Sequence, residues 1–496
     1  MPYSPGNAPR LPDPARDPET MTPDPDSTGP VAIVGAGVTG LAAAFRLGQL
    51  GIDAVVYEAS TRAGGPVHSV CRDGYLAEDG PNTLLETSPR IRALIRDIGL
   101  ADQCLGADSR ASKRFIVRNG VPKPIPGSIA GWLSTDLFSL HAKLRVLGDL
   151  FLPRQPTDAP EESVAGFVRR RLGGEFLDYA INPLVAGIYA GEPERLSVAQ
   201  AFPRLAAVER RHRSLFLGQL LGARERRRSG ETPRANAPKL SFVGGLGTLV
   251  SGLLRAVGNR VEYESSVAAL ARHVDGWEVE SRRGHQVHRR RHRAVLLAAP
   301  AHKLARISLE GREGNSLAWL AGIVHAPVTS LVLGFRRGDV AHPLDGFGLL
   351  VPALEPFPIL GAIFNSSLFP GRAPEGHVTI TCYLGGSRDP GLALAPQDHQ
   401  LGRVRESLAR LIGARGEPTF VHRCVHAQGI PQYNLGYGEF RERMRRLEES
   451  EPGLRFAGHF RDGISLSDCL VAGLRVAEEI AGSNPKAPAP APRANP

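Results

Sequence analysis

The fold is decided near the start of the chain by the stretch VAIVGAGVTGL, residues 31–41. Its apolar beginning predicts a short buried strand, Val31–Val34, and the residues beyond it predict a helix over Leu41–Leu50. A second apolar run, Ala54–Tyr57, predicts the next strand, so the three segments form a βαβ unit. Between the first strand and the helix lie three glycines with the spacing G-x-G-x-x-G: Gly35, Gly37 and Gly40.

This glycine turn has the residues that a nucleotide pyrophosphate requires. Glycine lets the chain turn tightly and approach the phosphates, while the helix N-terminus offers free N–H groups and the positive end of its dipole. Glu58 follows the second strand, close to the roughly 20 residues after the turn at which a carboxylate binds a ribose hydroxyl. A carboxylate there disfavours the 2′-phosphate of NADP. The predicted dinucleotide site consists of Gly35, Ala36, Gly37, Val38, Thr39, Gly40 and Glu58.

The composition is that of a folded globular chain. Of the 496 residues, 42% are hydrophobic and 22% are charged, which excludes disorder of the whole chain. At roughly 150 residues per domain, the length predicts two to three domains. The longest apolar stretch, residues 346–364, contains an acid and several prolines, so we predict no membrane-spanning helix. Five cysteines without a C-x-x-C pair exclude a disulfide framework and a cysteine-based zinc site.

Proline-rich ends flank the folded part of the chain. Residues 1–29 and 483–496 are predicted to be disordered tails, which leaves 30–482 as the folded body. Helical patterns dominate 128–230, and short strands dominate 325–385. The net charge of +10 suits an acidic substrate, an anionic lipid surface or nucleic acid.

Two further motifs resemble a known family. Residues 58–65, EASTRAGG, resemble the E-A-x-x-R-x-G-G signature of the amine oxidase and protoporphyrinogen oxidase superfamily, which binds FAD. The run Asp462–Asp468 precedes a predicted helix, and in that superfamily such a turn closes over the flavin. Cys469 stands at a helix start and not in the glycine context of a flavin-linked cysteine, so the resemblance implies non-covalent FAD. It assigns these further residues to the cofactor: Ala59, Arg62, Gly64, Gly65, Gly80, Pro81, Asn82, Thr83, Val267, Ile464, Ser465 and Leu466.

The middle of the chain narrows the resemblance. Residues 161–171 resemble the E-S-V-x-x-F-x-R-R stretch of oxygen-dependent protoporphyrinogen oxidases, and residues 182–193 resemble their P-x-x-x-G-x-Y-A-G-D-P. That family implies oxidation of protoporphyrinogen IX to protoporphyrin IX in haem biosynthesis, in three two-electron flavin cycles that each reduce O₂ to H₂O₂. The flavin supplies most of this chemistry, which agrees with a sequence that offers no Ser/His/Asp set, no evident general base and no metal site.

The resemblance also implies an architecture. We expect an α/β chain whose Rossmann-like, discontinuous FAD-binding domain is joined to a mixed-sheet substrate domain and a helical insertion. The FAD-binding domain is expected to comprise 30–110, 236–305 and 440–482. The substrate-binding sheet domain takes 306–439 with parts of 111–127, and the helical domain, which contacts membranes in the family, takes 128–235.

Five residues are assigned to the substrate by the same resemblance. Arg114 would hold a propionate, because a guanidinium fork matches a carboxylate; the alternative is a surface arginine beside a strand. Leu350, Ile363 and Tyr383 would clamp the flat macrocycle, although such residues are equally common in an ordinary core. Gly187 would leave room in the wall of the site, and the alternative is a glycine at a helix end.

Several alternatives stay open at this point. Within the same fold, the substrate is protoporphyrinogen IX or coproporphyrinogen III, and more distant alternatives are an amine oxidase, a carotenoid desaturase or a non-enzymatic basic FAD-binding protein. The tetrapyrrole and O₂ are the expected partners, a homodimer is left open, and the arginine clusters are expected not to bind nucleic acid. Residues 129–151 form either an interfacial or a core-facing helix. The expected location is the cytoplasm, with peripheral attachment to the cytoplasmic face of the inner membrane as the alternative.

The chain departs from the family pattern in several places. The family commonly has G-G-G-x-S-G-L at residues 35–41, where Ala36 and Thr39 are small enough to keep the turn, and Glu192 replaces the common Asp. Pro66 directly follows the glycine pair, where it removes an N–H donor. His459 stands where the family usually has Asn. These departures leave the expected fold unchanged and affect only the detailed flavin contacts.

Overall fold

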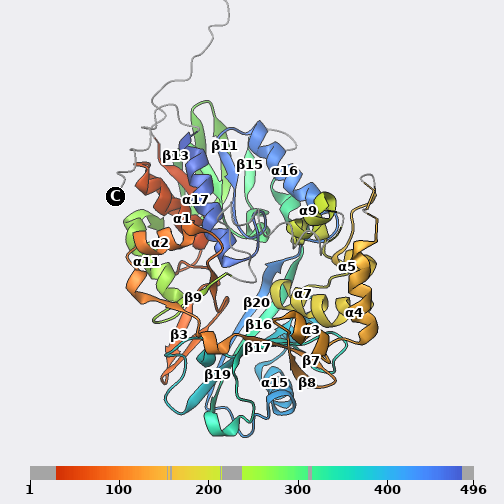
Figure 1. Ribbon diagram of the computed structural model, residues 1–496. Coiled ribbons are helices and arrows are strands. Elements are labelled where there is room, and N and C mark those ends of the chain that lie inside the picture. The colour runs from red at the N-terminus through yellow and green to blue at the C-terminus, as the bar shows by residue number, and fades with distance from the viewer. Residues whose placement is uncertain are drawn as a thin grey trace, which may run out of the picture.

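The computed structural model describes residues 29–153, 155–156, 159–212, 214, 237–310 and 316–482. Two sheet-rich parts lie one above the other in Figure 1, and a group of helices lies beside them. The predicted tails fall outside the described residues, apart from Gly29.

A five-stranded parallel sheet forms the centre of the first part, in the order β10-β2-β1-β14-β21. Its strands are β1 Val31–Val34, β2 Ala54–Tyr57, β10 Val261–Glu262, β14 Ala294–Leu297 and β21 Leu454–Phe456. Side chains of β1 alternate between two cores: Val31 and Ile33 pack on the helical side, and Ala32 packs on the opposite side. Burial on both faces explains why these strands are continuous apolar runs.

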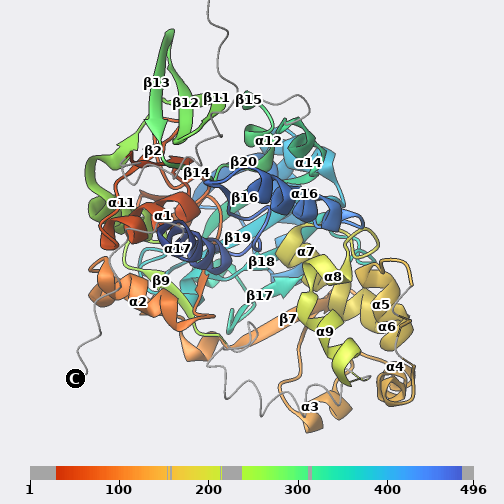
Figure 2. The same ribbon diagram turned by 90° about the horizontal axis from the view of Figure 1, so that it is seen from above.

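Helices cover one face of this sheet. They are α1 Val38–Gln49, α2 Pro89–Asp97, α11 Gly247–Val257 and α17 Leu466–Gly482. Helices α1 and α17 lie side by side in Figures 1 and 2. Their close approach depends on Gly473, because a Cβ at this position would lie 2.3 Å from the carbonyl oxygen of Thr39.

A four-stranded sheet lies on the opposite face, in the order β13-β12-β11-β15. Its strands are β11 Ser266–His273, β12 Gly276–Arg283, β13 Gln286–His292 and β15 Ser308–Glu310, with α12 Ala301–Leu304 and α16 Tyr437–Ser450 nearby. The β12–β13 hairpin projects from the molecule in Figure 2. Its arginines face carboxylates: Arg289 pairs with Glu280 and Arg290 with Glu262.

The second part is built on a mixed seven-stranded sheet, in the order β20-β16-β19-β18-β17-β7-β8. Neighbouring strands are antiparallel except β17 and β7, which are parallel. The strands are β7 Lys113–Arg118, β8 Val121–Pro124, β16 His325–Arg336, β17 Gly346–Leu350, β18 Ile359–Ile363, β19 His377–Gly385 and β20 Phe420–Pro431. Helices α13 Asn365–Leu368, α14 Pro390–Leu394 and α15 Gln397–Ile412 belong to the same part.

Two small sheets complete the strands. One pairs β3 Ser69–Arg72 with β4 Tyr75–Glu78, and the other has the order β5-β9-β6, from Leu84–Leu85, Lys239–Phe242 and Cys104–Gly106. Strand β4 contacts β16 of the seven-stranded sheet, and β6 is followed in the chain by β7 of the same sheet. The two small sheets therefore lie between the two larger parts.

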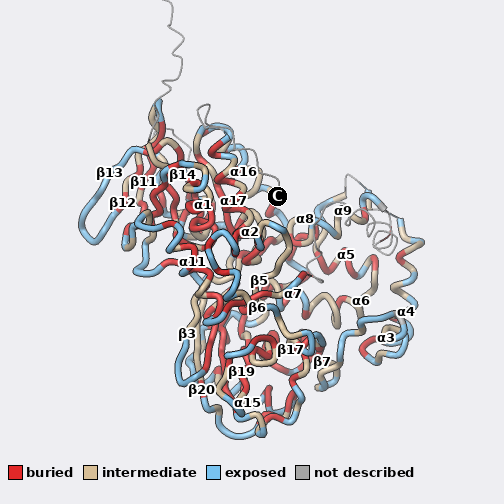
Figure 3. The backbone as a smooth tube through the Cα atoms, turned by 60° about the vertical axis from the view of Figure 1, so that its left-hand side comes forward, coloured by how far each residue is buried: buried red, intermediate tan, exposed pale blue. Residues whose placement is uncertain are grey.

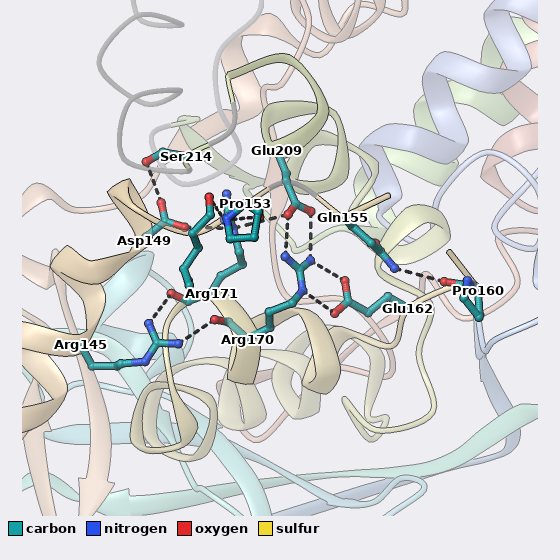
Figure 4. A network of polar contacts seen from close by, with 11 residues as sticks. Arg145, Asp149, Pro153, Gln155, Pro160, Glu162, Arg170, Arg171, Glu209 and Ser214 are labelled. Atoms are coloured by element: carbon teal, nitrogen blue, oxygen red, sulfur yellow. Dashed lines mark hydrogen bonds and ion pairs between the residues drawn. The ribbon is translucent and has the colours of Figure 1, made fainter. Parts of the chain in front are cut away.

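The helical part contains α3 Ile129–Ser134, α4 Leu140–Leu147, α5 Val164–Arg171, α6 Gly174–Phe176, α7 Asn182–Tyr189, α8 Val198–Ala201 and α9 Pro203–His212. Buried charges hold it together (Figure 4). Arg171 is fully buried, 3.0 Å from Asp149 and 3.6 Å from Glu209, and Arg170 binds Glu209 at 2.7 Å. Removing one partner of such a buried pair costs about 3–5 kcal/mol. The arginines of the 161–171 motif therefore have a structural role.

The segment 129–151 differs from the single helix that its pattern suggests. Ser128 caps α3 and Ser139 caps α4, so the chain forms two short helices with a break at Thr135. Phe138 in the break is buried, whereas apolar side chains of both helices are exposed. Figure 3 colours parts of both helices as exposed. Among the described residues, no helix combines the length and apolar character that crossing a bilayer requires.

Candidate functional site

The glycine turn is shaped by contacts with its own surroundings. Gly35 has a φ of +103°, and a Cβ there would lie 3.0 Å from the backbone of Ala299. A Cβ at Gly40 would lie 2.0 Å from the carbonyl oxygen of Gly35, so the fold itself requires both glycines. A Cβ at Gly37 would meet no described atom within 4 Å. Gly37 therefore faces open space at the start of α1.

This open space fits the pyrophosphate of a dinucleotide. Helix α1 begins at Val38 without a side-chain cap and without an acid in its first turn, so its N-terminal N–H groups present positive charge. The structure starts the helix three residues earlier than the predicted Leu41, because Val38, Thr39 and Gly40 form its first turn.

The Glu58 carboxylate is fixed at the end of β2. Its Oε2 accepts a hydrogen bond from the Ala36 N–H at 2.8 Å, and its Oε1 accepts from the Ser60 N–H at 2.9 Å. A carboxylate has about four acceptor positions, so it can still accept a ribose hydroxyl. The carbonyl of Glu58 accepts from the Ser265 N–H at 2.8 Å, which brings Val267, at the start of β11, to the same edge.

The second glycine pair lies directly against this turn. The Gly64 N–H donates to the Ala36 carbonyl at 2.8 Å, so residues 59–65, including Ala59, Arg62 and Gly65, border the glycine turn. A Cβ at Gly80 would lie 2.5 Å from the carbonyl oxygen of Pro66, so the loop 80–83, with Pro81 and Thr83, packs on the same segment. The backbone of Pro66 thus takes part in the close packing of the two loops.

The C-terminal turn reaches the same region through the start of α17. The Ser465 Oγ accepts from the Asp468 N–H at 3.2 Å, and the Asp468 carboxylate accepts from the Ser465 N–H at 3.4 Å, which is a capping box. Ile464 and Leu466 flank this cap. Burial raises the pKa of the Cys469 thiol to about 12, so this thiol stays protonated.

Four of the residues predicted to bind substrate share one face of the seven-stranded sheet. Arg114 pairs with Gly348, which pairs with Ile363, and Leu350 pairs with Gly361, which pairs with Tyr383. Residues directly opposite in a sheet point to the same side, and so do residues two apart in a strand. The two rows of paired residues therefore place the side chains of Arg114, Leu350, Ile363 and Tyr383 on the same face of the sheet. Gly348 and Gly361 lie between them in these rows and have no side chain that would fill this face.

Gly187 lies against this face from helix α7. A Cβ at Gly187 would lie 2.7 Å from Cδ2 of Leu350, so the helix backbone touches the leucine side chain. All five predicted substrate residues therefore surround one place. Gly187 itself is exposed and Leu350 is partly exposed, so this contact borders accessible space.

A polar network connects the substrate face with the loop 80–83. Asn82 is buried, and its amide donates to the phenolic oxygen of Tyr383, which donates to the Gly80 carbonyl at 3.3 Å. Asn365 donates to Asn82, and Thr381 donates to Asn365 at 2.7 Å. Burial raises the pKa of Tyr383 far above its usual value, so the phenol stays a hydrogen-bond donor.

Lys239 is a functional candidate that sequence reasoning missed. Burial lowers the pKa of its ammonium group, and the positive charge of Arg114 lowers it further, so the two cations repel each other. The signal in the sequence is slight, because Lys239 opens an ordinary short strand 125 residues from Arg114. An anionic ligand near both cations would relieve this repulsion.

The fold and this site define a class. A βαβ unit with an uncapped helix N-terminus, a carboxylate at the end of the second strand and a second, mixed sheet fit a flavin-dependent oxidoreductase. The model of the family described as "Flavin containing amine oxidoreductase" matches residues 38–481. The chain belongs to this family, which confirms the predicted fold class and the predicted cofactor, FAD.

Named relatives and solved structures agree with this assignment. The chain is 33% identical to the mitochondrial protoporphyrinogen oxidase of Nicotiana tabacum, over 91% of this chain and 94% of that protein. It is 30% identical to the coproporphyrinogen III oxidase of Bacillus subtilis (strain 168), over 89% and 96% of the two chains. A crystal structure of a candidate protoporphyrinogen oxidase from Exiguobacterium sp. 255-15 has the same fold, with a TM-score of 0.76 at 24% identity, covering 91% and 98%.

Proposed function

We propose that this protein is an FAD-dependent porphyrinogen oxidase that converts protoporphyrinogen IX to protoporphyrin IX. The observation that carries the proposal is one face of the seven-stranded sheet. On this face Arg114 lies with the apolar side chains of Leu350 and Ile363, and Gly187 of helix α7 packs against Leu350. A tetrapyrrole needs this combination, because its macrocycle is flat and apolar while its propionates are anionic. The relatives named as porphyrinogen oxidases support the same reaction.

The roles of the residues follow from their positions. Arg114 and Lys239 bind the propionates, which would otherwise be costly to remove from water. Leu350, Ile363 and Tyr383 contact the macrocycle and exclude water from it. When bound, the flavin accepts the electron pair and passes it to O₂, so the protein mainly orients the substrate.

The FAD is held non-covalently by the three loops that meet at the start of α1. The glycine turn and Glu58 bind the pyrophosphate and ribose, and the turn before α17 closes over the remainder. Acid precipitation should release the flavin into the supernatant. Flavin that stays with the precipitated protein would contradict non-covalent binding.

The reaction is tested by aerobic incubation of the FAD-loaded protein with protoporphyrinogen IX. We expect porphyrin fluorescence to rise with enzyme concentration and H₂O₂ to accumulate at three molecules per porphyrin, as six electrons require. Heat-inactivated protein corrects for spontaneous oxidation. Fluorescence that rises no faster with active than with inactivated protein would reject the proposal.

Coproporphyrinogen III is the second candidate substrate. The observation that favours it is Lys239, a second cation whose pKa the charge of Arg114 lowers, because coproporphyrinogen has propionates where protoporphyrinogen has vinyl groups. The two substrates should be compared at equal concentration in the same assay. The larger kcat/KM identifies the physiological class, and the Lys239→Met variant should penalise coproporphyrinogen more strongly.

We further propose that the helical part contacts an anionic membrane surface peripherally. Large apolar side chains on or next to α3 and α4 are strongly exposed: Leu133 68%, Leu140 73%, Leu144 59%, Leu147 48% and Phe151 81%. Exposed apolar groups of this size, on a chain with a net charge of +10, suit an anionic bilayer interface on the cytoplasmic side.

Vesicle sedimentation tests this contact. Vesicles rich in anionic lipid should carry the protein down at low salt and release part of it at high salt. Leu140→Gln with Leu144→Gln should reduce binding, whereas Val287→Gln on the exposed β13 strand should not. A concentration-dependent doubling of mass without vesicle binding would instead assign the patch to a homodimer interface.

A further inference from the structure

A carboxylate held between two imidazoles lies next to the proposed flavin loops. Asp79 follows β4 and directly precedes Gly80. Its Oδ2 accepts a hydrogen bond from Nδ1 of His68 at 2.7 Å, and its Oδ1 accepts from Nε2 of His422 at 2.7 Å. The Asp79 side chain is only 11% exposed, so it depends on these donors for the hydrogen bonds that water would supply.

The cluster joins three separate elements. His68 follows the glycine pair of the flavin loop and precedes β3, while His422 lies on β20 of the seven-stranded sheet. On the same face of β20, Nε2 of His426 binds the backbone carbonyl of Asp79 at 2.9 Å. Since Asp79 adjoins Gly80, the cluster lies at the same junction of flavin loop and substrate sheet as Asn82.

His68 forms the open end of the cluster. Its side chain is 42% exposed, whereas that of His422 is 17% exposed. Within the described part of the chain, Nε2 of His68 makes no hydrogen bond, so this nitrogen can take up a proton from a group outside the cluster.

The charges around the cluster keep Asp79 ionised. Burial opposes its charge, but the hydrogen bonds from His422 and His68 outweigh burial and hold the pKa of Asp79 below its usual value. Glu78 directly precedes Asp79 in the chain, and burial raises the pKa of Glu78 to about 7. Cys424 stays a thiol because burial raises its pKa to about 11, and Arg62 adds a positive charge on this side.

The proposed reaction produces a proton that a group of this kind can hold. The three two-electron oxidations of a porphyrinogen together remove four meso C–H hydrogens and two N–H hydrogens. Each cycle removes one C–H hydrogen as a hydride, for which the flavin is the acceptor, and one proton. The proton comes from an N–H bond in two cycles and from a meso C–H bond in the third, and the electron pair of that bond remains in the new conjugated system. Reduction of O₂ to H₂O₂ then consumes the hydride and one proton, so each cycle is balanced.

We propose that His68, oriented by Asp79 and supported by His422, accepts the proton that the porphyrinogen loses in each cycle. The proton goes to Nε2 of His68, and Asp79 stabilises the resulting imidazolium through Nδ1. Asp79 is a positioning residue in this scheme. The inference rests on the proposed function, because it requires a substrate that loses a proton together with a hydride.

Anaerobic stopped-flow mixing with protoporphyrinogen tests the scheme through the rate at which the flavin absorbance falls. In His68→Gln, flavin reduction should slow by roughly 10²-fold, the scale of general-base catalysis. Added imidazole should restore part of the rate in His68→Ala, which a merely structural role would not allow.

A readout without turnover comes from NMR of the FAD-loaded protein labelled at the histidine rings. Asp79→Asn should shift the ring signals of both His68 and His422 and leave that of His288 on the exposed β13 strand unchanged. His288→Gln is also the kinetic control, and its flavin should be reduced at the wild-type rate. Visible flavin absorbance and melting temperature show that each variant is folded.

The outcomes distinguish a failure of the proposed function from a failure of the proton transfer to His68. A wild-type flavin that no porphyrinogen bleaches would overturn the proposed function and this scheme with it. A wild type that bleaches while His68→Gln bleaches at the same rate would overturn the scheme alone. A slow variant that imidazole does not rescue would assign the cluster a structural role, which also overturns the scheme.

Discussion

Gly187 of helix α7 touches Leu350 of strand β17: a Cβ at position 187 would lie 2.7 Å from Cδ2 of the leucine. The contact joins the helical part to the face of the seven-stranded sheet that we assign to the substrate. A side chain at position 187 would push Leu350 toward that face and narrow the proposed substrate site. The width of the site therefore depends on the absence of a Cβ at Gly187.

Gly187→Ala should therefore raise KM for the porphyrinogen and leave flavin binding unchanged. Leu350 is the flexible end of a side chain, so it can move, and we expect a loss of roughly 1–3 kcal/mol, the scale of moderate overpacking. Steady-state kinetics measures the effect. Gly187→Ala combined with Leu350→Ala should recover part of the loss, and strictly additive effects of the two changes would contradict the contact.

Gly37→Val should abolish flavin retention without unfolding the protein. A side chain at this position meets no described protein atom within 4 Å, so it would occupy only the space that we assign to the pyrophosphate. Gly40→Val is the comparison, because its Cβ would lie 2.0 Å from the Gly35 carbonyl and should prevent folding. The ratio of visible to ultraviolet absorbance after gel filtration measures retention. A yellow, folded Gly37→Val protein would show that the pyrophosphate lies elsewhere.

Arg114→Ala should raise KM by the equivalent of roughly 2–3 kcal/mol, as expected for a desolvated charge-assisted pair. Arg114→Lys should recover part of this loss, since it keeps the charge but loses the guanidinium fork. Lys239→Met should produce a smaller increase, because Arg114 still holds a carboxylate. The flavin spectrum should be unchanged in all three variants. An unchanged KM in the arginine variants would assign propionate binding to other cations.

Glu78 should make the stability of the protein depend on pH. Burial raises the pKa of this carboxyl from 4.5 to about 7, and it accepts hydrogen bonds from Ser69 at 2.6 Å and from the Leu246 N–H at 2.8 Å. A raised pKa means that the folded state favours the protonated form, so this contribution is present below pH 4.5 and is lost as the pH rises to about 7.

Glu78→Gln should remove the loss of folding stability that the ionisation of Glu78 causes as the pH rises. Thermal unfolding of the FAD-loaded protein between pH 5 and pH 8 should show the variant gaining stability relative to the wild type as the pH rises. Glu375→Gln on an exposed loop is the matched control. Parallel curves for wild type and Glu78→Gln would show that Glu78 is ionised in the folded protein throughout this range.

The sequence predicts those parts of the fold that depend on local pattern. Strands Val31–Val34 and Ala54–Tyr57 lie where predicted, because strands buried on both faces must be continuous apolar runs. The single helix suggested for residues 129–151 is wrong in detail, since two serine caps divide it. The start of α1 at Val38 was also missed, because glycines that begin a helix resemble a turn.

The parts of the site that join distant segments could not be predicted from pattern. Asn82 binds Tyr383 across 301 residues, and His422 binds Asp79 across 343 residues. Nothing in the local sequence of either partner indicates such a pairing, since single polar residues beside strands are common. The resemblance located the predicted residues one by one, and the strand register of the sheet brought Arg114 and Tyr383 onto one face.

The central claim is that this site oxidises a porphyrinogen with its flavin, and anaerobic reduction of that flavin tests it most directly. FAD-loaded protein mixed with protoporphyrinogen IX or coproporphyrinogen III in the absence of oxygen should lose its visible flavin absorbance within seconds. It should regain the absorbance, with porphyrin fluorescence, when oxygen is admitted. A flavin that stays oxidised with both porphyrinogens, yet is reduced by dithionite in the same cuvette, would contradict the account.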